Sequence, residues 1–246
     1  MRCEDEQEGD AKGEDEHDGW KKVLAGGASD PVSGASMIIH ADALAWMAAT
    51  PAEPGTSVIT SLPDVSELPL PLDAWRAWFV DAARRVVRWV PEDGLAIFFQ
   101  SDIREKNVLV DKGYLVMRAA EAENAKLMFH KVAWRKPPGR NAFGRPTYSH
   151  LVAVTRGEAR APVHPGPDVF DAGAMSWSRA MGLEACAVAC RYLRDNTSTR
   201  IVVDPFCGRG GVLSVACNMG FDVIGVDLSA KRCRATRKVM SAGAPG

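Results

Sequence analysis

The chain has 246 residues, of which 46% are hydrophobic and 25% are charged, and its formal net charge is −1. This length and composition favour one large α/β core over two domains. We expect no membrane span, because no apolar run approaches roughly 20 residues, and the acidic N-terminal residues are unlike a signal or transit peptide.

Acidic residues are concentrated at the start of the chain. Residues 1–20 hold nine acidic and two basic residues with few apolar side chains, so we predict a disordered acidic tail there and a single folded domain over residues 21–246. The rest of the chain then holds 28 basic and 22 acidic residues. This excess of positive charge favours an anionic partner, and an ordinary solvated surface explains it equally well.

The six cysteines show neither a CxxC pair nor the Cys/His spacing of a zinc site. Cys186 and Cys190 share one helix face, which is the usual arrangement of packed core side chains. We therefore expect no bound metal. A reducing compartment fits this pattern, which means the cytoplasm, or the nucleus in a eukaryote.

The first half of the ordered chain alternates short apolar strands with helices. Strands are predicted at residues 36–40, 57–60 and 94–100. Helices are predicted at residues 43–49, 72–89 and 111–124. The apolar positions of the long helix recur at the helical period: Trp75, Phe79, Ala82, Val86 and Trp89.

The second half begins with two strands that no helix separates. Residues 127–134 and 148–155 flank a loop rich in glycine, proline and arginine, which predicts an antiparallel pair at a sheet edge. A proline-rich connection over residues 158–173 follows, and then a helix from Arg179 to Arg194.

The C-terminal part reads IVVDPFCGRGG at residues 201–211, a buried strand that runs into a tight glycine turn. A helix over residues 212–219 and a strand over residues 221–227 follow. In α/β folds this unit holds a nucleoside-bearing cofactor, because the glycines let the backbone approach it and the terminal acid accepts hydrogen bonds from ribose hydroxyls. Only 19 residues follow Asp227, so upstream strands must complete the sheet, giving seven strands in all.

A dinucleotide-binding protein would share this strand, glycine turn and acid. Its fingerprint needs a third glycine for close packing of helix on strand, and this chain has Leu213 at that place. We therefore disfavour hydride transfer.

These features resemble the class I S-adenosylmethionine-dependent methyltransferases. Their order along the chain resembles one branch, the circularly permuted amino-methyltransferases of the DNA β type. The matching segments are HADALAW (40–46), TSLPD (60–64), MSWSRAMGLEACAVACRYL (175–193), VVDPFCGRGGVL (202–213) and GVDLS (225–229). The resemblance implies a Rossmann-like, seven-stranded mixed sheet with helices on both faces, and S-adenosylmethionine as the cofactor.

The resemblance also implies which residues contact the cofactor. Asp204 and Phe206 would lie beside its methionine part, and Gly208 and Gly210 would permit close approach of the backbone. The stretch from Ser176 to Gly182 would close over the methionine end. Without a cofactor, the two glycines would form a plain tight turn.

Two further acids would bind the nucleoside. The resemblance implies that Asp227 binds the ribose hydroxyls and that Asp42 binds the adenine amino group. The alternative for Asp227 is a helix N-cap ahead of Leu228.

The chain departs from this family at the catalytic motif. In the amino-methyltransferases that motif is Asp, Asn or Ser, then Pro-Pro, then Tyr or Phe, and the ring stacks on the flipped base. Here the four residues are Ser61, Leu62, Pro63 and Asp64, so the usual stacking ring is missing. Three aromatic residues are candidates to replace it: Trp75, Tyr148 and Trp177.

We predict Ser61, Pro63 and Asp64 as catalytic residues, with Asp102 as a further candidate at the end of a strand. Asp64 would act as a general base or accept a hydrogen bond from a base edge or a ribose hydroxyl. Its alternative role is to cap the turn before Pro69.

The loop from Arg135 to His150 carries basic and aromatic side chains that suit a nucleic-acid contact. A solvated edge loop with structural prolines is the alternative. His130 and His150 are interpreted as structural. SLPD-like, WHK-like and GRP-YSH-like motifs, here at residues 61–64, 129–131 and 144–150, resemble those of an uncharacterised methyltransferase subgroup.

The sequence thus predicts an S-adenosylmethionine-dependent methyltransferase acting on RNA, at a nitrogen or a ribose oxygen. RNA is favoured over DNA because no DNA target-recognition domain is recognisable. The alternatives are a DNA amino-methyltransferase, a small-molecule methyltransferase, or an inactive subunit that binds RNA or a protein.

Overall fold

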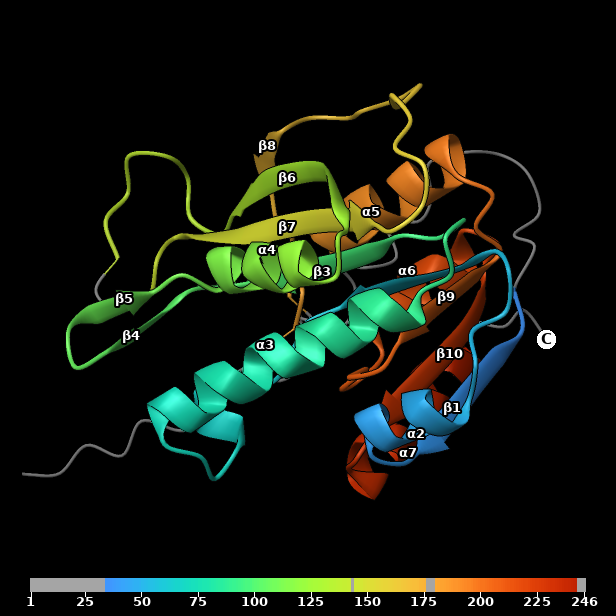
Figure 1. The fold of residues 1–246 in the computed structure, drawn as a ribbon, viewed down its shortest axis with the longest axis horizontal. Helices are drawn as coiled ribbons and strands as arrows, with labels where there is room; N and C mark the ends of the chain where they lie inside the picture. The colour runs from blue at the N-terminus through green and yellow to red at the C-terminus, as the bar shows by residue number, and fades with distance from the viewer. Residues whose placement is uncertain (1–33, 143, 176–179, 243–246) are drawn as a thin grey trace, which may run out of the picture. The chain divides into compact units, whose positions relative to one another are not determined.

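An eight-stranded mixed sheet organises the chain (Figure 1). The computed structural model describes residues 34–142, 144–175 and 180–242, so the acidic tail predicted for residues 1–20 lies outside the described residues. The strands lie side by side in the order β1 (Ser36–His40), β10 (Asp222–Asp227), β9 (Ile201–Asp204), β2 (Thr56–Thr60), β3 (Ala96–Gln100), β7 (Tyr148–Thr155), β6 (Lys126–Trp134) and β8 (Val169–Asp171).

The first five strands of this order are parallel, and β7 is antiparallel to both β3 and β6. All seven predicted strands are present, and β6 and β7 form the predicted antiparallel pair. The eighth strand, β8, lies within the segment predicted as a proline-rich connection. Backbone bonds at either end hold it against β6, from Val132 N to Asp168 O and from Ala172 N to Trp134 O.

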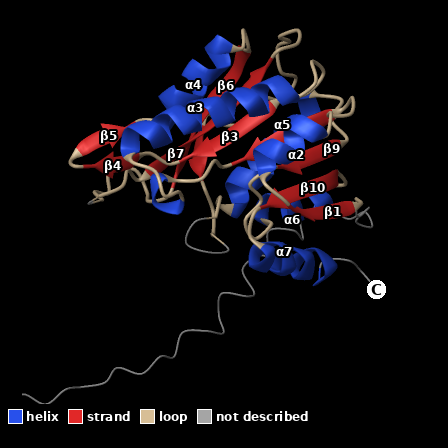
Figure 2. Ribbon diagram, turned by 60° about the horizontal axis from the view of Figure 1, so that its bottom comes forward, coloured by secondary structure: helices blue, strands red, loops and turns tan. Residues whose placement is uncertain are grey.

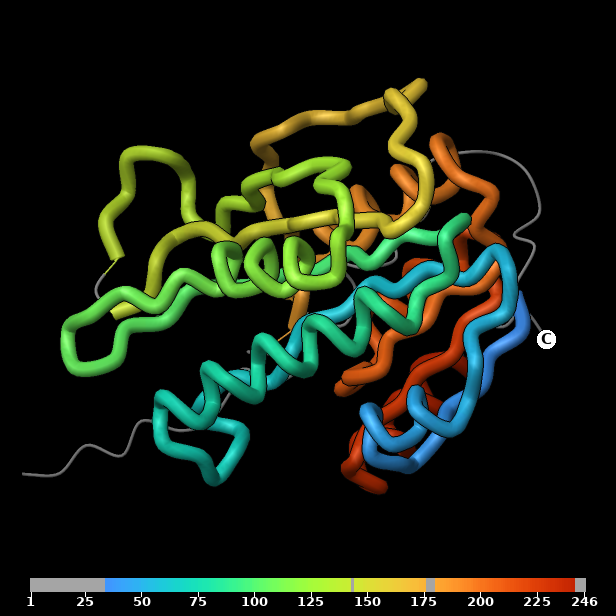
Figure 3. Tube along the Cα trace, viewed as in Figure 1, coloured from blue at the N-terminus to red at the C-terminus, as the bar shows by residue number. Residues whose placement is uncertain are grey.

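The strands around the glycine turn lie inside the sheet. β10 pairs with β1 on one side, and β9 pairs with β2 on the other. Figure 3 shows the N-terminal blue segment running beside the C-terminal red one. The prediction that upstream strands complete the sheet around β9 and β10 is therefore confirmed.

Helices cover both faces of the sheet (Figure 2). On one face are α2 (Ala43–Ala49), α3 (Leu72–Trp89) and α4 (Lys112–Ala122), and on the other are α5 (Leu183–Asn196), α6 (Gly211–Asn218) and α7 (Ala230–Ala242). Because successive side chains of a strand point to opposite faces, Val58 packs with α3 while its neighbour Ile59 packs with α5. This is the predicted Rossmann-like layering.

Two helices refine the sequence prediction. The predicted core stripe of α3 is buried at its first four positions, and Trp89 is half-buried, donating from Nε1 to Thr50 O at 2.6 Å. The helix predicted from Arg179 begins at Leu183 in the described residues, because Gly182 has extended backbone and bridges to Met175.

A hairpin that the sequence analysis did not predict follows β3. Its strands are β4 (Ile103–Glu105) and β5 (Val108–Val110), and it projects from the sheet (Figure 1). Lys106 and Asn107 form its turn with φ of 48° and 66°, the left-handed pair that a tight two-residue hairpin requires. None of the described helices combines the length and the apolar character needed to cross a membrane.

Candidate active site

A cavity of about 270 Å³ lies at the carboxyl ends of β1, β10, β9 and β2. Ligands gather at this edge in open α/β sheets, because the loops after the strands meet there. Its lining includes seven of the predicted site residues: Asp42, Ser61, Pro63, Asp204, Phe206, Gly208 and Asp227. Three others, Asp64, Asp102 and Gly210, are not part of the lining, and Ser176 lies outside the described residues.

Asp204 ends β9 at the floor of the cavity. Its Oδ1 accepts hydrogen bonds from Thr60 Oγ1 at 2.7 Å and from Phe206 N at 3.1 Å. Burial raises the pKa of the Asp204 carboxyl to about 7, and the nearby charge of Asp227 adds to that rise while the two hydrogen bonds oppose it. The site thus contains a carboxyl that titrates near neutral pH.

The glycine turn follows Asp204, and its two predicted glycines have different surroundings. Gly208 has a φ of 56° and lines the cavity. Gly210 has a φ of 79° and precedes α6, and a Cβ there would lie 2.5 Å from Thr236 Cγ2 of α7. Gly210 is therefore required for the packing of the turn on α7.

Asp227 ends β10, and its side chain links this strand to the glycine turn. Its Oδ2 accepts from Gly208 N at 3.0 Å, and its Oδ1 accepts from Ser229 N at 2.7 Å. A carboxylate oxygen accepts more than one hydrogen bond, so these contacts leave acceptor capacity toward the cavity. Ser229 is the residue before α7, and its hydroxyl accepts from Arg232 N at 3.3 Å.

Asp42 follows β1 at the exposed edge of the cavity. It is the N-cap of α2, and its Oδ1 accepts from Ala45 N at 2.8 Å. Ala41 N donates to Asp227 O at 3.3 Å, so the turns that carry these two acids are directly linked.

The SLPD segment follows β2, the neighbour of β9. Ser61, Leu62 and Pro63 all line the cavity, and Leu62 also packs in the core beside α3. Trp75 Nε1 donates to Pro63 O at 3.2 Å and so fixes this segment against α3.

Both carboxylate oxygens of Asp64 contact neighbouring groups of the chain itself. It caps a short 3-10 helix over Val65–Glu67, and its Oδ1 accepts from Val65 N at 2.7 Å. Its Oδ2 lies 2.8 Å from Arg145 Nη2 and 3.9 Å from the buried Lys112 Nζ. Burial lowers the pKa of Lys112, and the Asp64 charge opposes that effect. These contacts correspond to the capping alternative.

The predicted replacement aromatics do not line the described cavity. Trp75 is fully buried against Phe79, Tyr148 lies beside Asp102, and Trp177 is outside the described residues. The aromatic side chain of α3 that lines the cavity is Trp78, whose ring stands edge-on to Phe206 at 6.4 Å. The sequence analysis missed Trp78, although a tryptophan beside the buried stripe of an amphipathic helix was a usable signal.

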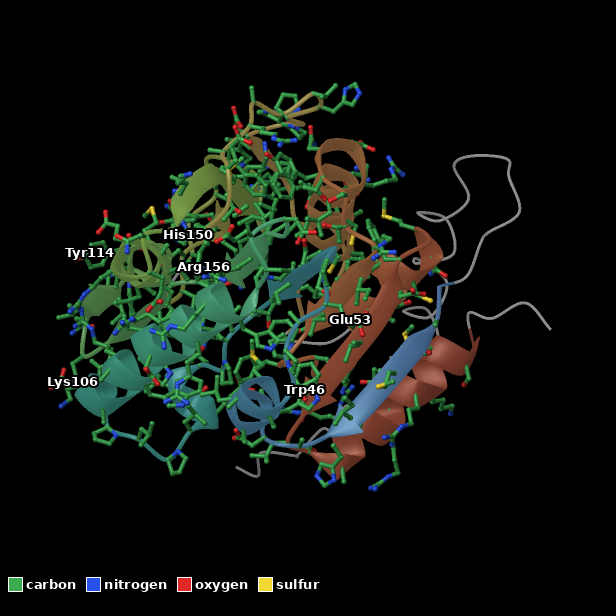
Figure 4. The ribbon with its side chains drawn as sticks, turned by 45° about the vertical axis from the view of Figure 1, so that its right-hand side comes forward. Trp46, Glu53, Lys106, Tyr114, His150 and Arg156 are labelled. Carbon is green, nitrogen blue, oxygen red and sulfur yellow. The ribbon has the colours of Figure 1, made fainter. Side chains whose placement is uncertain are left out.

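Asp102 lies beyond β3 in a separate polar cluster. It is fully buried, and it accepts from Lys112 N at 2.8 Å and from His150 Nε2 at 3.1 Å. Burial alone would raise the pKa of Asp102, but the bonds from His150 and from the Lys112 amide outweigh burial and hold the pKa below its ordinary value. Figure 4 shows His150 on the side where Tyr114 lies, away from Trp46.

The loop predicted to contact nucleic acid is partly fixed by the chain itself. Arg145 pairs with Asp64, and Arg135 Nη2 donates to Pro146 O at 2.7 Å. Lys136 and Arg140 are exposed.

No family model and no curated protein sequence matches the chain. Solved structures do match it. The putative DNA modification methylase TTHA0409 of Thermus thermophilus is 16% identical, with a TM-score of 0.68 over 86% of this chain and 96% of that chain. PvuII DNA methyltransferase, described as cytosine-N4-specific, is 14% identical, with a TM-score of 0.68 over 85% of this chain and 87% of that chain.

A third match is the complex of M1.HpyAVI with SAM, 16% identical, with a TM-score of 0.55 over 83% of this chain and 99% of that chain. TM-scores of 0.55–0.68 over 83–86% of this chain show a shared fold. The chain therefore has the Rossmann-like fold of the class I methyltransferases, as the sequence resemblance implied.

Proposed function

We propose that this protein is an S-adenosylmethionine-dependent methyltransferase that modifies an exocyclic amino group of DNA. The observation that carries the proposal is that Asp204 and Asp227 line the same cavity as Ser61 and Pro63 of the SLPD segment. The residues assigned to the cofactor and those assigned to the acceptor thus line the same cavity, and the strands that carry them include the neighbouring parallel strands β9 and β2.

The residues of the cavity fit the cofactor. Asp227 and Asp42 offer carboxylates to the ribose and adenine, and Gly208 brings backbone to the cavity wall. Asp204 is a buried carboxyl with a pKa raised to about 7, and a cationic sulfonium nearby would favour its charged form. A solved structure of TTHA0409, 15% identical to this chain, is described as complexed with S-adenosyl-L-methionine.

The acceptor residues would act mainly by positioning. When bound, the cofactor supplies a methyl group on a positively charged sulfur, so alignment of the acceptor lone pair carries most of the rate. We assign Ser61 to accept a hydrogen bond from the amine and Pro63 to form the wall beside it. Trp78 takes the place of the missing stacking ring, since it lines the cavity from α3.

DNA replaces RNA as the favoured substrate. The sequence analysis preferred RNA, and that preference finds no support among the matching structures, whose descriptions are of DNA methylases. The DNA alternative fits them better. The exposed basic residues Lys136 and Arg140 are the candidates to contact the phosphate backbone.

Calorimetry with S-adenosylmethionine tests the cofactor assignment. We expect binding by the full chain and a loss of at least tenfold in affinity for Asp227→Asn. Asp222→Asn is the matched control, because Asp222 begins the same strand and its side chain bonds only to Ala35 N among the described contacts. Absence of binding, or equal binding by both variants, would overturn the cofactor assignment.

Transfer of a labelled methyl group tests the acceptor. Unmethylated duplex DNA, single-stranded DNA and total RNA would be compared with the same enzyme and labelled cofactor. Label in DNA that is recovered as a methylated amino group supports the proposal. Label in RNA alone would restore the RNA interpretation and reject the DNA proposal.

A further inference from the structure

Four polar side chains meet at the carboxyl end of β3, outside the cavity. The cluster consists of Asp102, Asp111, His130 and His150, which come from the end of β3, the N-cap of α4, β6 and β7. We call it the Asp102–His150 cluster. Its members are not part of the cavity lining, so the proposed methyl transfer does not account for them.

Three of these side chains place potential metal-ligating atoms close together. His150 Nε2 lies 3.1 Å from both Asp102 oxygens and 3.7 Å from Asp111 Oδ1. One ligand atom from each residue lies within 4.8 Å of the others. Ligands about 2.0–2.2 Å from a zinc ion at tetrahedral angles are about 3.3–3.6 Å apart, so an ion fits with small side-chain adjustments.

His130 provides the outer contact that metal-binding histidines usually have. Its Nε2 lies 2.8 Å from His150 Nδ1. Without an ion, His130 Nε2–H donates to His150 Nδ1, and His150 Nε2–H donates to Asp102. With an ion on His150 Nε2, the His150 proton moves to Nδ1 and His130 shifts its own proton from Nε2 to Nδ1. His130 Nε2 then accepts a hydrogen bond from His150 Nδ1–H, which fixes the imidazole as a ligand.

The charges of the cluster also favour a cation. Among the described residues, Asp102 and Asp111 have no lysine or arginine within ion-pair distance. The charge of the buried Lys112 acts on Asp102, but its ion pair is with Asp64. The neighbouring Gln100 pairs with His150 across the two strands, and its buried amide oxygen and nitrogen have no hydrogen-bond partner in the described structure. Such a group points to a missing water or ion.

We propose that Asp102, Asp111 and His150 bind one divalent metal ion, with His130 as the orienting partner. One imidazole nitrogen and two carboxylates suit Zn²⁺ or Mn²⁺, with water in the remaining positions. Asp111 is half-exposed, so the ion has a path to solvent. The sequence analysis expected no metal because the cysteines lack the spacing of a zinc site. The ligands proposed here follow no local motif either, since Asp102 and His150 are 48 positions apart.

The test uses the full chain, stripped with a chelator and titrated with Zn²⁺ and with Mn²⁺ alone in a calorimeter. We expect one saturable site per chain. Asp111→Asn should weaken binding at least tenfold while keeping the fold, because asparagine is an equally good N-cap. His130→Gln should weaken it about 10- to 100-fold, as loss of an outer partner does.

Asp73→Asn is the matched control, because Asp73 is an exposed aspartate at the start of another helix, in the first turn of α3. It should bind the ion as the unchanged chain does. Nitrogen-15 spectra of the imidazoles give an independent readout, since the ion should move the His150 proton from Nε2 to Nδ1. No saturable binding, or equal binding by Asp111→Asn and the unchanged chain, would overturn the proposal. Neither outcome depends on methyl transfer.

Discussion

The Thr60 hydroxyl donates a 2.7 Å hydrogen bond to Asp204 Oδ1 and joins the ends of β2 and β9 at the cavity floor. Both side chains are buried, with exposed fractions of 0% and 4%. This bond opposes the effect of burial, which raises the pKa of Asp204 to about 7. Asp204 therefore carries a proton in the folded protein over a pH range where the unfolded chain has lost it.

Asp204→Asn is expected to stabilise the ligand-free protein at pH 7 and above. Because the folded-state pKa is raised, the contribution of Asp204 to stability is greatest below pH 4 and is lost as the pH rises toward 7. Asparagine keeps an acceptor for Thr60 and cannot ionise. Thermal melts should show the variant several degrees above the unchanged chain at pH 8, with the difference vanishing near pH 4. A constant difference across this range would contradict the assignment.

Gly210→Ala is expected to destabilise the protein by about 2–4 kcal/mol. The new methyl group would lie 2.5 Å from Thr236 Cγ2, and the φ of 79° disfavours any side chain. Thr236→Ser removes the clashing methyl, so the double variant should recover the steric part and retain only the backbone part. Denaturant unfolding measures both parts. If Gly210→Ala lowers the free energy of unfolding equally in the unchanged chain and in the Thr236→Ser background, the Thr236 methyl group is not the obstacle.

Asp64→Asn is expected to destabilise the protein by about 3 kcal/mol, because it leaves the buried Lys112 without its counter-charge. Asparagine still caps the short 3-10 helix. In a Lys112→Met background the same substitution should cost less than about 1 kcal/mol. If the doubly substituted protein melts normally yet loses all methyl transfer, Asp64 is a catalytic residue after all.

Trp78→Ala is expected to lower kcat/KM for the nucleic-acid substrate about 5- to 150-fold, the equivalent of one lost stacking contact. Trp78→Phe keeps a ring and should retain most of the activity. Trp46→Phe is the matched control, since Trp46 is a half-buried tryptophan on the neighbouring helix that does not line the cavity. Full activity of Trp78→Ala would show that Trp78 does not contact the acceptor.

The central strands and the part of the cavity lined by Asp204, Gly208 and Asp227 could be predicted from the sequence because their signals are local. A buried strand, a glycine turn and a terminal acid occupy consecutive residues from Ile201 to Asp227. The seven main strands are four to nine residues long and contain apolar, largely β-branched residues. In contrast, β8 and the β4–β5 hairpin have strands of only three residues, and their pairing depends on partners elsewhere in the chain.

The surroundings of the SLPD segment and the Asp102–His150 cluster depend on the long-range register of the strands, which the sequence does not specify. His130 and His150 were interpreted as separate structural histidines. Their contact follows from the β6–β7 register, in which Val132 lies opposite His150 and Val152 lies opposite His130. Trp78 was assigned to neither the core nor the site, because the helical period alone does not tell which flank of α3 faces the cavity.

The pairing of β1 with β10 has a consequence for how the chain folds. Ala35 N donates to Asp222 Oδ1 across 187 positions, and the neighbour of β1 in the sheet is β10, the last strand of the described residues. At about 5–20 residues per second, a ribosome would complete β10 roughly 10–40 s after β1. The sheet therefore closes only after β10 has been synthesised, and the slow step of folding is expected to be the insertion of β9 and β10 between strands already made.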